Sequence, residues 1–323
     1  MGTPEFAVAS LDALVKAGCN IVGVVTAPDK PGGRGMQLQE SAVKKYAVEN
    51  QLRVLQPEKL KNLEFIEELR SLQADLQIVV AFRMLPEVVW NMPAMGSVNL
   101  HGSLLPQYRG AAPINWAVIN GEKETGVTTF KLKHEIDTGD ILLQESFPIA
   151  EDDTVGIVHD KMKSIGARVL LQTVKGLADS SLQERPQLTP PNGTHLQENL
   201  HPSDGLRLTG NTDGQTILKH APKIFTETSQ VDFDKTVEDV YNLIRGLSPY
   251  PAAFTFLNGK KLKIFKAEKV NIKPTHEPGN FDSDGKTCLQ FACANGYIKI
   301  LDLQLEGKKR MLVEDFLRGY RFE

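Results

Sequence analysis

The chain has 323 residues, of which 41% are hydrophobic and 24% charged, and its formal net charge is −3. This length and ordinary composition are typical of a folded protein with more than one core, and they exclude a disordered, collagen-like or disulfide-rich chain. Because the net charge is slightly negative, any contact with nucleic acid must come from a local basic patch.

Cysteine usage and hydropathy indicate the compartment. Cys19, Cys288 and Cys293 lack the spacing of a metal cluster, and the last two are interpreted as small buried thiols beside a strand. No metal is therefore expected. There is no run of 18 apolar residues, and the start lacks the basic and apolar regions of a secretion signal. These features predict a cytoplasmic protein without a membrane partner.

The first half of the chain alternates short apolar strands with helices, which is the pattern of a parallel α/β sheet. The predicted strands cover residues 21–25, 76–82, 97–100, 127–132 and 141–149, and the predicted helices cover 6–17, 42–50, 63–72, 112–120 and 154–177. Thr3 and Pro4 suit the cap and the first turn of the opening helix. A helix that begins there leaves no strand ahead of it, so we expect either a truncated start, which we favour, or a sheet that lacks a strand.

The second half has a different organisation. Between residues 181 and 220 the chain is rich in Pro, Gly, Asn, Thr and Gln, which predicts a linker without chemistry. A helix is predicted over 236–245, and the pairs Asn258-Gly259 and Asn295-Gly296 predict tight hairpins between short strands. The expected fold is an α/β, Rossmann-like, mostly parallel sheet with helices on both faces (1–180), a linker (181–220) and a small OB-like β-barrel (221–323).

Polar side chains gather after the strand predicted at 97–100. Asn99 and His101 are two residues apart, so in an extended chain both side chains point the same way. The turn 135–140 could place the carboxylate of Asp137 beside them. Asn99 and a protonated His101 could then donate hydrogen bonds to an oxyanion, while Asp137 orients or charges the imidazole and helps to move a proton. This set suits acyl transfer to an amine; a structural or solvated role of the histidine is the alternative.

Longer motifs give a close resemblance to the folate-dependent formyltransferases. They are Ser103–Trp116, with Asn99 and His101 before it and Asp137–Asp140 after it, together with the opening Gly2–Phe6. In that family the opening motif follows a first strand, which favours the truncated start. Three further segments are similar to the second domain of the family members that act on tRNA: Ala221–Ile224, Ile244–Ala252 and Asp315–Gly319. The resemblance covers nearly the whole chain except about residues 189–215, which look inserted.

The resemblance implies a role for individual positions. Asn99, His101 and Asp137 match the catalytic residues of the family. The positions that match the tetrahydrofolate site are Ser103, Leu104, Leu105 and Pro106, and those that match the wall of the pterin pocket are Phe82, Arg83, Met84 and Leu85. The chain is one residue shorter than the family in that wall, which leaves its individual assignments open. An ordinary core position is the alternative for Leu104 and Leu105, and it is compatible with a largely apolar pocket.

A basic, glycine-rich loop lies at residues 28–35, after the first predicted strand. It has neither of the glycine patterns of nucleotide-binding loops. A surface loop without chemistry is one interpretation. The resemblance implies another, in which the loop enters the acceptor stem of a tRNA with Arg34 at the position of the essential arginine. Lys30, Lys44 and Lys45 would widen this RNA-binding patch.

The expected reaction is transfer of a formyl group from the co-substrate 10-formyltetrahydrofolate, a reduced folate, to the amino group of the methionyl residue on initiator tRNA. The protein is expected to act as a monomer. One rival is transfer to a small amine: glycinamide ribonucleotide should not require the second domain, and an amino-sugar nucleotide should not require the basic loop. Hydrolysis of the formylfolate is another. A non-catalytic tRNA-binding protein would have no use for Asn99, His101 and Asp137.

Overall fold

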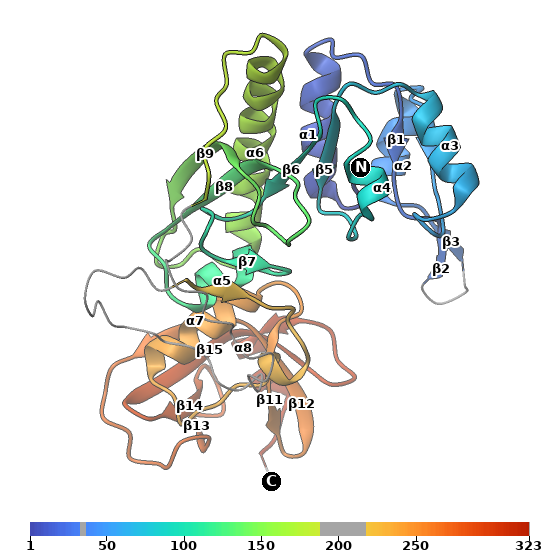
Figure 1. Cartoon of the computed structure of the whole chain (residues 1–323). Coiled ribbons are helices and arrows are strands. Elements are labelled where there is room, and N and C mark those ends of the chain that lie inside the picture. Colours follow the sequence, from blue (N-terminus) through green and yellow to red (C-terminus); the bar gives the residue numbers. More distant parts are fainter. Residues whose placement is uncertain (33–36, 188–217, 323) are drawn as a thin grey trace. The chain divides into compact units, whose positions relative to one another are not determined.

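The structure is a computed structural model, and it describes residues 1–32, 37–187 and 218–322 (Figure 1). The chain forms two compact units. Unit 1 comprises residues 1–109, 126–147 and 160–189, and unit 2 comprises residues 110–125, 148–159 and 190–323. Two segments of the first half of the chain, residues 110–125 and 148–159, thus group with the C-terminal residues.

Unit 1 is built on short strands of mixed direction. Its main sheet has the order β5 (Gln77–Val80), β6 (Ser97–His101), β8 (Glu124–Lys131) and β9 (Ile141–Pro148), while β1 (Val24–Val25) pairs with β4 (Val54–Leu55). The pairs β1–β4 and β5–β6 are parallel, and β6–β8 is antiparallel. Residues 1 and 2 lie between β1 and β5, since the Gly2 amide donates to the Val25 carbonyl (3.0 Å) and the Val80 amide donates to the Met1 carbonyl (2.9 Å).

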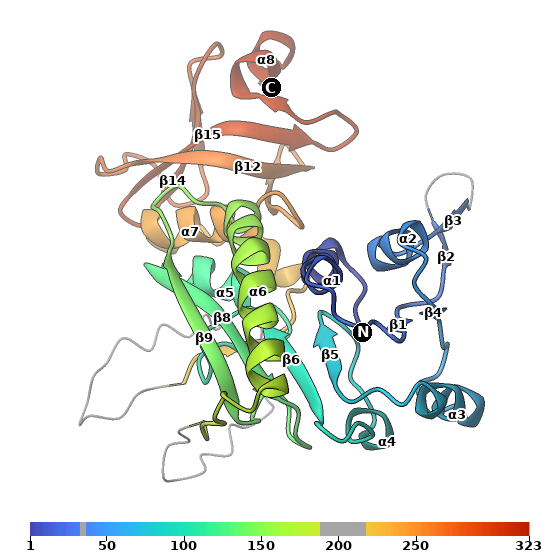
Figure 2. The same cartoon turned by 90° about the horizontal axis from the view of Figure 1, so that it is seen from above.

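Helices surround these strands. They are α1 (Glu5–Lys16), α2 (Ala42–Glu49), α3 (Leu63–Ser71), α4 (Glu87–Trp90) and α6 (Val155–Ala178). The predicted cap at Thr3 is wrong: Pro4 occupies the N-cap position of α1 and makes no side-chain hydrogen bond there. Helix α6 lies along the sheet (Figure 2), where a Cβ atom on Gly166 would lie 3.0 Å from the Leu100 side chain. No helix in the described part of the chain is both long and apolar enough to span a bilayer.

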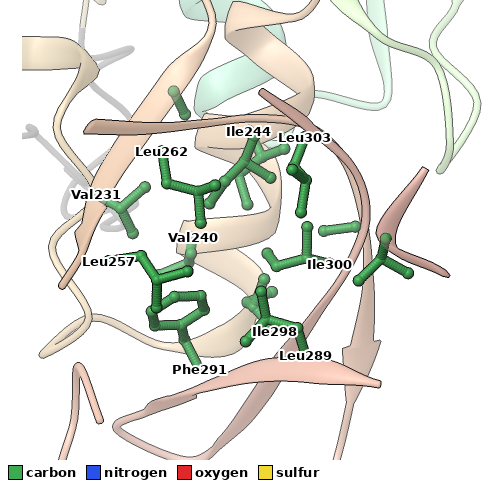
Figure 3. Close-up of a cluster of buried hydrophobic side chains, with 14 of the residues drawn as sticks. Val231, Val240, Ile244, Leu257, Leu262, Leu289, Phe291, Ile298, Ile300 and Leu303 are labelled. Carbon is green, nitrogen blue, oxygen red and sulfur yellow. The ribbon is translucent and has the colours of Figure 1, made fainter. Parts of the chain in front are cut away.

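Unit 2 contains a curled antiparallel half-barrel sheet that wraps around one helix, α7 (Val237–Leu247), as Figure 3 shows. The strand order is β11 (Ala253–Leu257), β12 (Lys260–Val270), β15 (Gly296–Leu305), β14 (Leu289–Cys293) and β13 (Phe281–Ser283), with β16 (Met311–Leu312) beside β15. The remaining elements are α5 (Pro113–Ile119), α8 (Val313–Gly319), the 3-10 helix Glu227–Ser229, and the two-residue strands β7 (Arg109–Gly110) and β10 (His220–Ala221). The fold is thus the expected α/β domain followed by a small curled β domain.

The two predicted hairpin turns have different outcomes. Asn258 and Gly259 have φ values of 48° and 73° and join β11 to β12, as the Asn-Gly pair predicts. The second turn is displaced by one residue, because Cys293 pairs with Gly296. Asn295 instead accepts a hydrogen bond from the Val237 amide (2.8 Å) at the start of α7. Its side chain therefore satisfies an amide in the first turn of α7, while its backbone lies in the hairpin turn.

A close approach of α5 and α7 within unit 2 explains why residues 110–125 group with the C-terminal residues. The Asn115 side chain donates to the Gly246 carbonyl (2.8 Å). A Cβ atom on Gly246 would lie 2.5 Å from Cγ1 of Ile119 and 2.9 Å from its backbone nitrogen. Only glycine fits at this crossing without a shift of the helices.

Gly246→Ala is expected to lower the free energy of unfolding of unit 2 by about 1–3 kcal/mol, the usual cost of forcing an extra methyl group into a packed contact. Urea denaturation followed by circular dichroism measures this. Gly319→Ala is the matched control, because a Cβ atom there meets nothing within 4 Å. Equal stability of the two variants would contradict the steric account.

Candidate active site

The candidate site lies at the carboxyl end of β6. The core of unit 1 holds this strand, since Val98 and Leu100 are buried and β5 and β8 pair on either side. His101 is the last residue of the strand and is only 7% exposed. A histidine so deeply buried needs partners for both ring nitrogens.

The hydrogen bond of Nε2 fixes the tautomer of the His101 ring. Nε2 lies 2.9 Å from the carbonyl oxygen of Tyr108. A carbonyl oxygen only accepts, so Nε2 carries the hydrogen and donates it. Tyr108 has a φ of 59°, in the left-handed region that non-glycine residues rarely adopt. The Phe130 ring packs edge-on against the imidazole, with ring centroids 6.4 Å apart. Nδ1 is therefore the ring nitrogen left for chemistry.

Asp137 faces that nitrogen. Its Oδ2 lies 3.9 Å from Nδ1 of His101, and the two side chains are 12% and 8% exposed. The turn that carries Asp137 is tightly constrained: Asp137 has a φ of 55°, and a Cβ atom on Gly139 would lie 1.6 Å from the Lys131 carbonyl oxygen. Glycine is therefore obligatory at 139, and the turn brings a carboxylate to the imidazole, as the sequence predicts.

Asn99 lies two residues before His101 on the same strand and is half-buried. Its neighbours across the sheet are Val79 on β5 and Phe130 on β8. Alternation along the strand puts Asn99 and His101 on one face of the sheet. The Asn99 side chain makes no hydrogen bond to any residue that the structure describes, so its amide can still donate to a ligand.

The predicted folate segment, residues 103–106, is held by side chains that sequence reasoning missed. The Thr128 hydroxyl donates to the Ser103 carbonyl (2.7 Å) and accepts from the Leu105 amide (3.1 Å). Gln144 donates to the Leu105 carbonyl (2.8 Å) and to the Thr128 hydroxyl (2.9 Å). The one signal for Thr128 is a hydroxyl side chain in the buried middle of a strand. Ser103 and Leu105 are buried, whereas Leu104 and Pro106 are partly exposed.

The predicted pterin wall, residues 82–85, lies beside a groove of about 550 Å³. The groove is lined by Leu60, Lys61 and residues 83–88, and none of Asn99, His101 and Asp137 lines it. Arg83 donates hydrogen bonds to the Pro57 and Glu58 carbonyls, which fixes it on the rim. Phe82 is half-buried, Leu85 is buried and Met84 is 74% exposed. The four side chains therefore differ in exposure, and Phe82 does not line the groove.

The predicted RNA-binding residues lie around the hairpin of β2 (Lys30–Gly32) and β3 (Gln37–Gln39). Lys30 and Lys45 are exposed. The Lys44 ammonium pairs with Asp29 and, at 2.8 Å, with Glu40, so its charge holds the base of the hairpin together. Lys44 is thus less available to a phosphate than its neighbour Lys45. Arg34 lies outside the described residues.

Comparisons with known proteins match both halves of the chain to one family. The family model described as formyl transferase matches residues 1–174, and the one described as formyl transferase, C-terminal domain, matches residues 223–321. A methionyl-tRNA formyltransferase from Bacteroides fragilis is 51% identical over 325 aligned positions, which cover 99% of this chain and 94% of that protein. One from Phocaeicola vulgatus is 56% identical with the same coverage.

Solved structures support the same fold. An N-formyltransferase from Helicobacter canadensis, in complex with folinic acid and dTDP-3-aminofucose, superposes with a TM-score of 0.64 at 20% identity, over 96% of this chain and 97% of that one. HypX from Aquifex aeolicus in complex with tetrahydrofolic acid gives 0.57 at 18% identity, over 85% of this chain but only 45% of HypX. With two matching domains and about half of its residues identical to these relatives, the chain belongs to the formyl transferase family, as an enzyme of its methionyl-tRNA formyltransferase group.

Proposed function

We propose that the protein transfers the formyl group of 10-formyltetrahydrofolate to the α-amino group of methionyl initiator tRNA, for translation initiation. The observation that carries the proposal is the pair formed by buried His101 and half-buried Asp137 at the end of β6, with Nδ1 and Oδ2 3.9 Å apart. Both residues stand on one end of the sheet with Asn99, where open α/β sheets bind ligands. Acyl transfer to an amine needs donors for an oxyanion and a group that moves a proton, and these three side chains supply them.

The proposed roles follow from the hydrogen bonds. The amine attacks the formyl carbon directly, without a covalent enzyme intermediate. Asn99 and Nδ1 of a protonated His101 donate to the oxygen on which negative charge develops. Asp137 stabilises the imidazolium and assists transfer of the amine proton, directly or through a water. The bond from Nε2 to the Tyr108 carbonyl leaves only Nδ1 for this task. The carbon–nitrogen bond to the donor then breaks, and the donor nitrogen receives a proton.

A reduced folate as the donor is supported by the family and by the segment 103–106. Folinic acid and tetrahydrofolic acid are bound by the two structural neighbours named above. In this chain the segment begins two residues after His101, and its backbone is fixed by Thr128 and Gln144. A rigid backbone beside partly exposed apolar side chains fits a flat heterocycle that needs few polar anchors.

The tRNA acceptor is supported by the names of the relatives and by the exposed lysines beside the β2–β3 hairpin. Lys30 and Lys45 can contact phosphates. A reaction on charged tRNA belongs in the cytoplasm, and a monomer suffices because the proposed catalytic groups all come from one chain.

The test mixes purified protein and 10-formyltetrahydrofolate with methionyl initiator tRNA, glycinamide ribonucleotide or a dTDP-amino sugar, and follows the formylated product of each. Formylmethionyl-tRNA as the main product supports the proposal. Formylation of a small amine without formylation of the tRNA would contradict it, as would loss of the formyl group to water alone.

Arg34→Ala is expected to raise the KM for methionyl initiator tRNA about tenfold or more, since a hydrogen bond to a charged group contributes roughly 1.5–3 kcal/mol. The KM for the folate should stay within about twofold of the native value. Steady-state kinetics with each substrate varied in turn measure both. Arg70→Ala, an exposed arginine on α3, is the control. An equal rise in the KM values for the tRNA and the folate would contradict the role assigned to the basic loop at residues 28–35.

A further inference from the structure

One buried glutamine lies in the segment predicted to be a linker without chemistry. Gln187 is 9% exposed, although the four residues before it are exposed. A glutamine carries two donors and one acceptor, and all of them must be satisfied when it is buried. Its partners therefore show what it does.

The Gln187 amide group holds the turn that carries Asp137. Its Nε2 donates to the carbonyl of Asp137 itself (3.0 Å) and to the carbonyl of Gly139 (2.8 Å). These two carbonyls belong to the constrained residues of the turn. Asp137 has a left-handed backbone conformation, and Gly139 lies against the Lys131 backbone. A left-handed non-glycine residue persists only when its surroundings enforce it, and the Gln187 side chain is one of the groups that do so.

The remaining atom of the Gln187 amide is held by a partly buried cation. The oxygen accepts from Nη2 of Arg109 at 2.6 Å. This contact sets which end of the amide faces the turn, because the guanidinium can only donate. Burial lowers the pKa of Arg109, while the nearby negative charges of Asp137 and Glu135 oppose that shift. Nε of Arg109 is buried without a hydrogen-bond partner among the described residues. Such a cation orients Gln187 and adds positive charge beside Asp137.

We propose that Gln187 is a positioning residue of the formyl transfer reaction, which fixes the backbone of Asp137 so that its carboxylate faces Nδ1 of His101. Arg109 holds Gln187 in the orientation that this requires. The inference rests on the proposed function, because it gives Gln187 its effect through Asp137. Gln187 follows α6 in the chain, so one residue that contributes to the reaction lies outside β6 and the turn at residues 135–140.

The test compares Gln187→Met with Gln183→Met. Methionine keeps the volume of glutamine and loses all three hydrogen bonds, and Gln183 is an exposed glutamine of the same segment. Gln187→Met is expected to lower kcat for formylation of methionyl initiator tRNA about 10–100-fold, since a displacement of about 1 Å can cost 10²-fold. The KM values and the number of folate molecules bound per chain should not change. Gln183→Met should match the native protein.

A second measurement separates positioning from a general structural role. In an Asp137→Asn background, Gln187→Met should lower kcat less than about twofold further, because groups that act as one unit are not additive. If Gln187→Met does not fold, Gln187→Glu carries the same test, since it keeps the acceptor for Arg109 and loses both donated bonds. A native kcat for the Gln187 variant, or the same loss in both backgrounds, would overturn the inference. An inactive native protein would instead refute the proposed function.

Discussion

Replacement of His101 by alanine is expected to lower kcat for formylation of methionyl initiator tRNA by about 10³-fold. Loss of one oxyanion donor costs about 10²–10³-fold, and we expect the larger value because Asp137 also loses the imidazolium that it stabilises. A single imidazole nitrogen provides this donor. Nδ1 is that nitrogen, since Nε2 is bonded to the Tyr108 carbonyl. Rapid-quench measurement of the formylated tRNA gives the rate.

Folding must be measured alongside, since the change also removes the buried hydrogen bond between the imidazole and the Tyr108 carbonyl. That can cost about 1–3 kcal/mol of stability. Binding of one folate per chain and an intact thermal transition would show that the loss lies in catalysis. His276→Ala is the control, because His276 is an exposed histidine of unit 2. A His101→Ala variant within tenfold of the native rate would exclude the role assigned to this residue.

Asp137→Asn is expected to lower kcat by about 10²–10⁴-fold while the fold is kept, because the carboxylate is replaced by a neutral group of the same shape. Asparagine suits this position, since it adopts the left-handed backbone that Asp137 has, with a φ of 55°. The bond from Gln187 goes to the backbone carbonyl and survives the change. The effect therefore reports on the charge facing His101.

The same rapid-quench assay measures this variant, with Asp75→Asn, an exposed carboxylate of unit 1, as the control. Tight folate binding with slow transfer is the expected pattern. A loss of folate affinity in proportion to the loss of rate would mean that Asp137 serves binding rather than the chemical step.

The elements of the fold could be predicted where local pattern and burial agree. The segments predicted as strands at residues 97–100 and 141–149 form β6 and β9, and Asn258-Gly259 forms the turn that its backbone preference requires. The turn predicted at Asn295-Gly296 lies one residue earlier, and Asn295 accepts a hydrogen bond from the Val237 amide of α7, a tertiary contact that spacing does not reveal. Gly246 likewise gives no local signal of the α5 contact that draws residues 110–125 into unit 2.

Residues of the candidate site could be predicted from the sequence where they share one strand or belong to a recognisable motif. Asn99 and His101 share β6, and Asp137 stands in a turn whose glycine is sterically required. Their proposed roles stay a prediction until turnover is measured. Thr128, Gln144 and Gln187 could not be found from the sequence, because each acts on a backbone far along the chain through contacts that exist only after folding.

The most direct measurement is the single-turnover rate of formylmethionyl-tRNA formation by the native protein, His101→Ala, Asp137→Asn and the double variant, each saturated with both substrates. If the carboxylate works through the imidazole, the double variant should be no more than about threefold slower than the slower single variant. If the rate loss of the double variant equals the product of the two single losses, or if the double variant is as fast as the native protein, the two side chains do not act together on one formyl group.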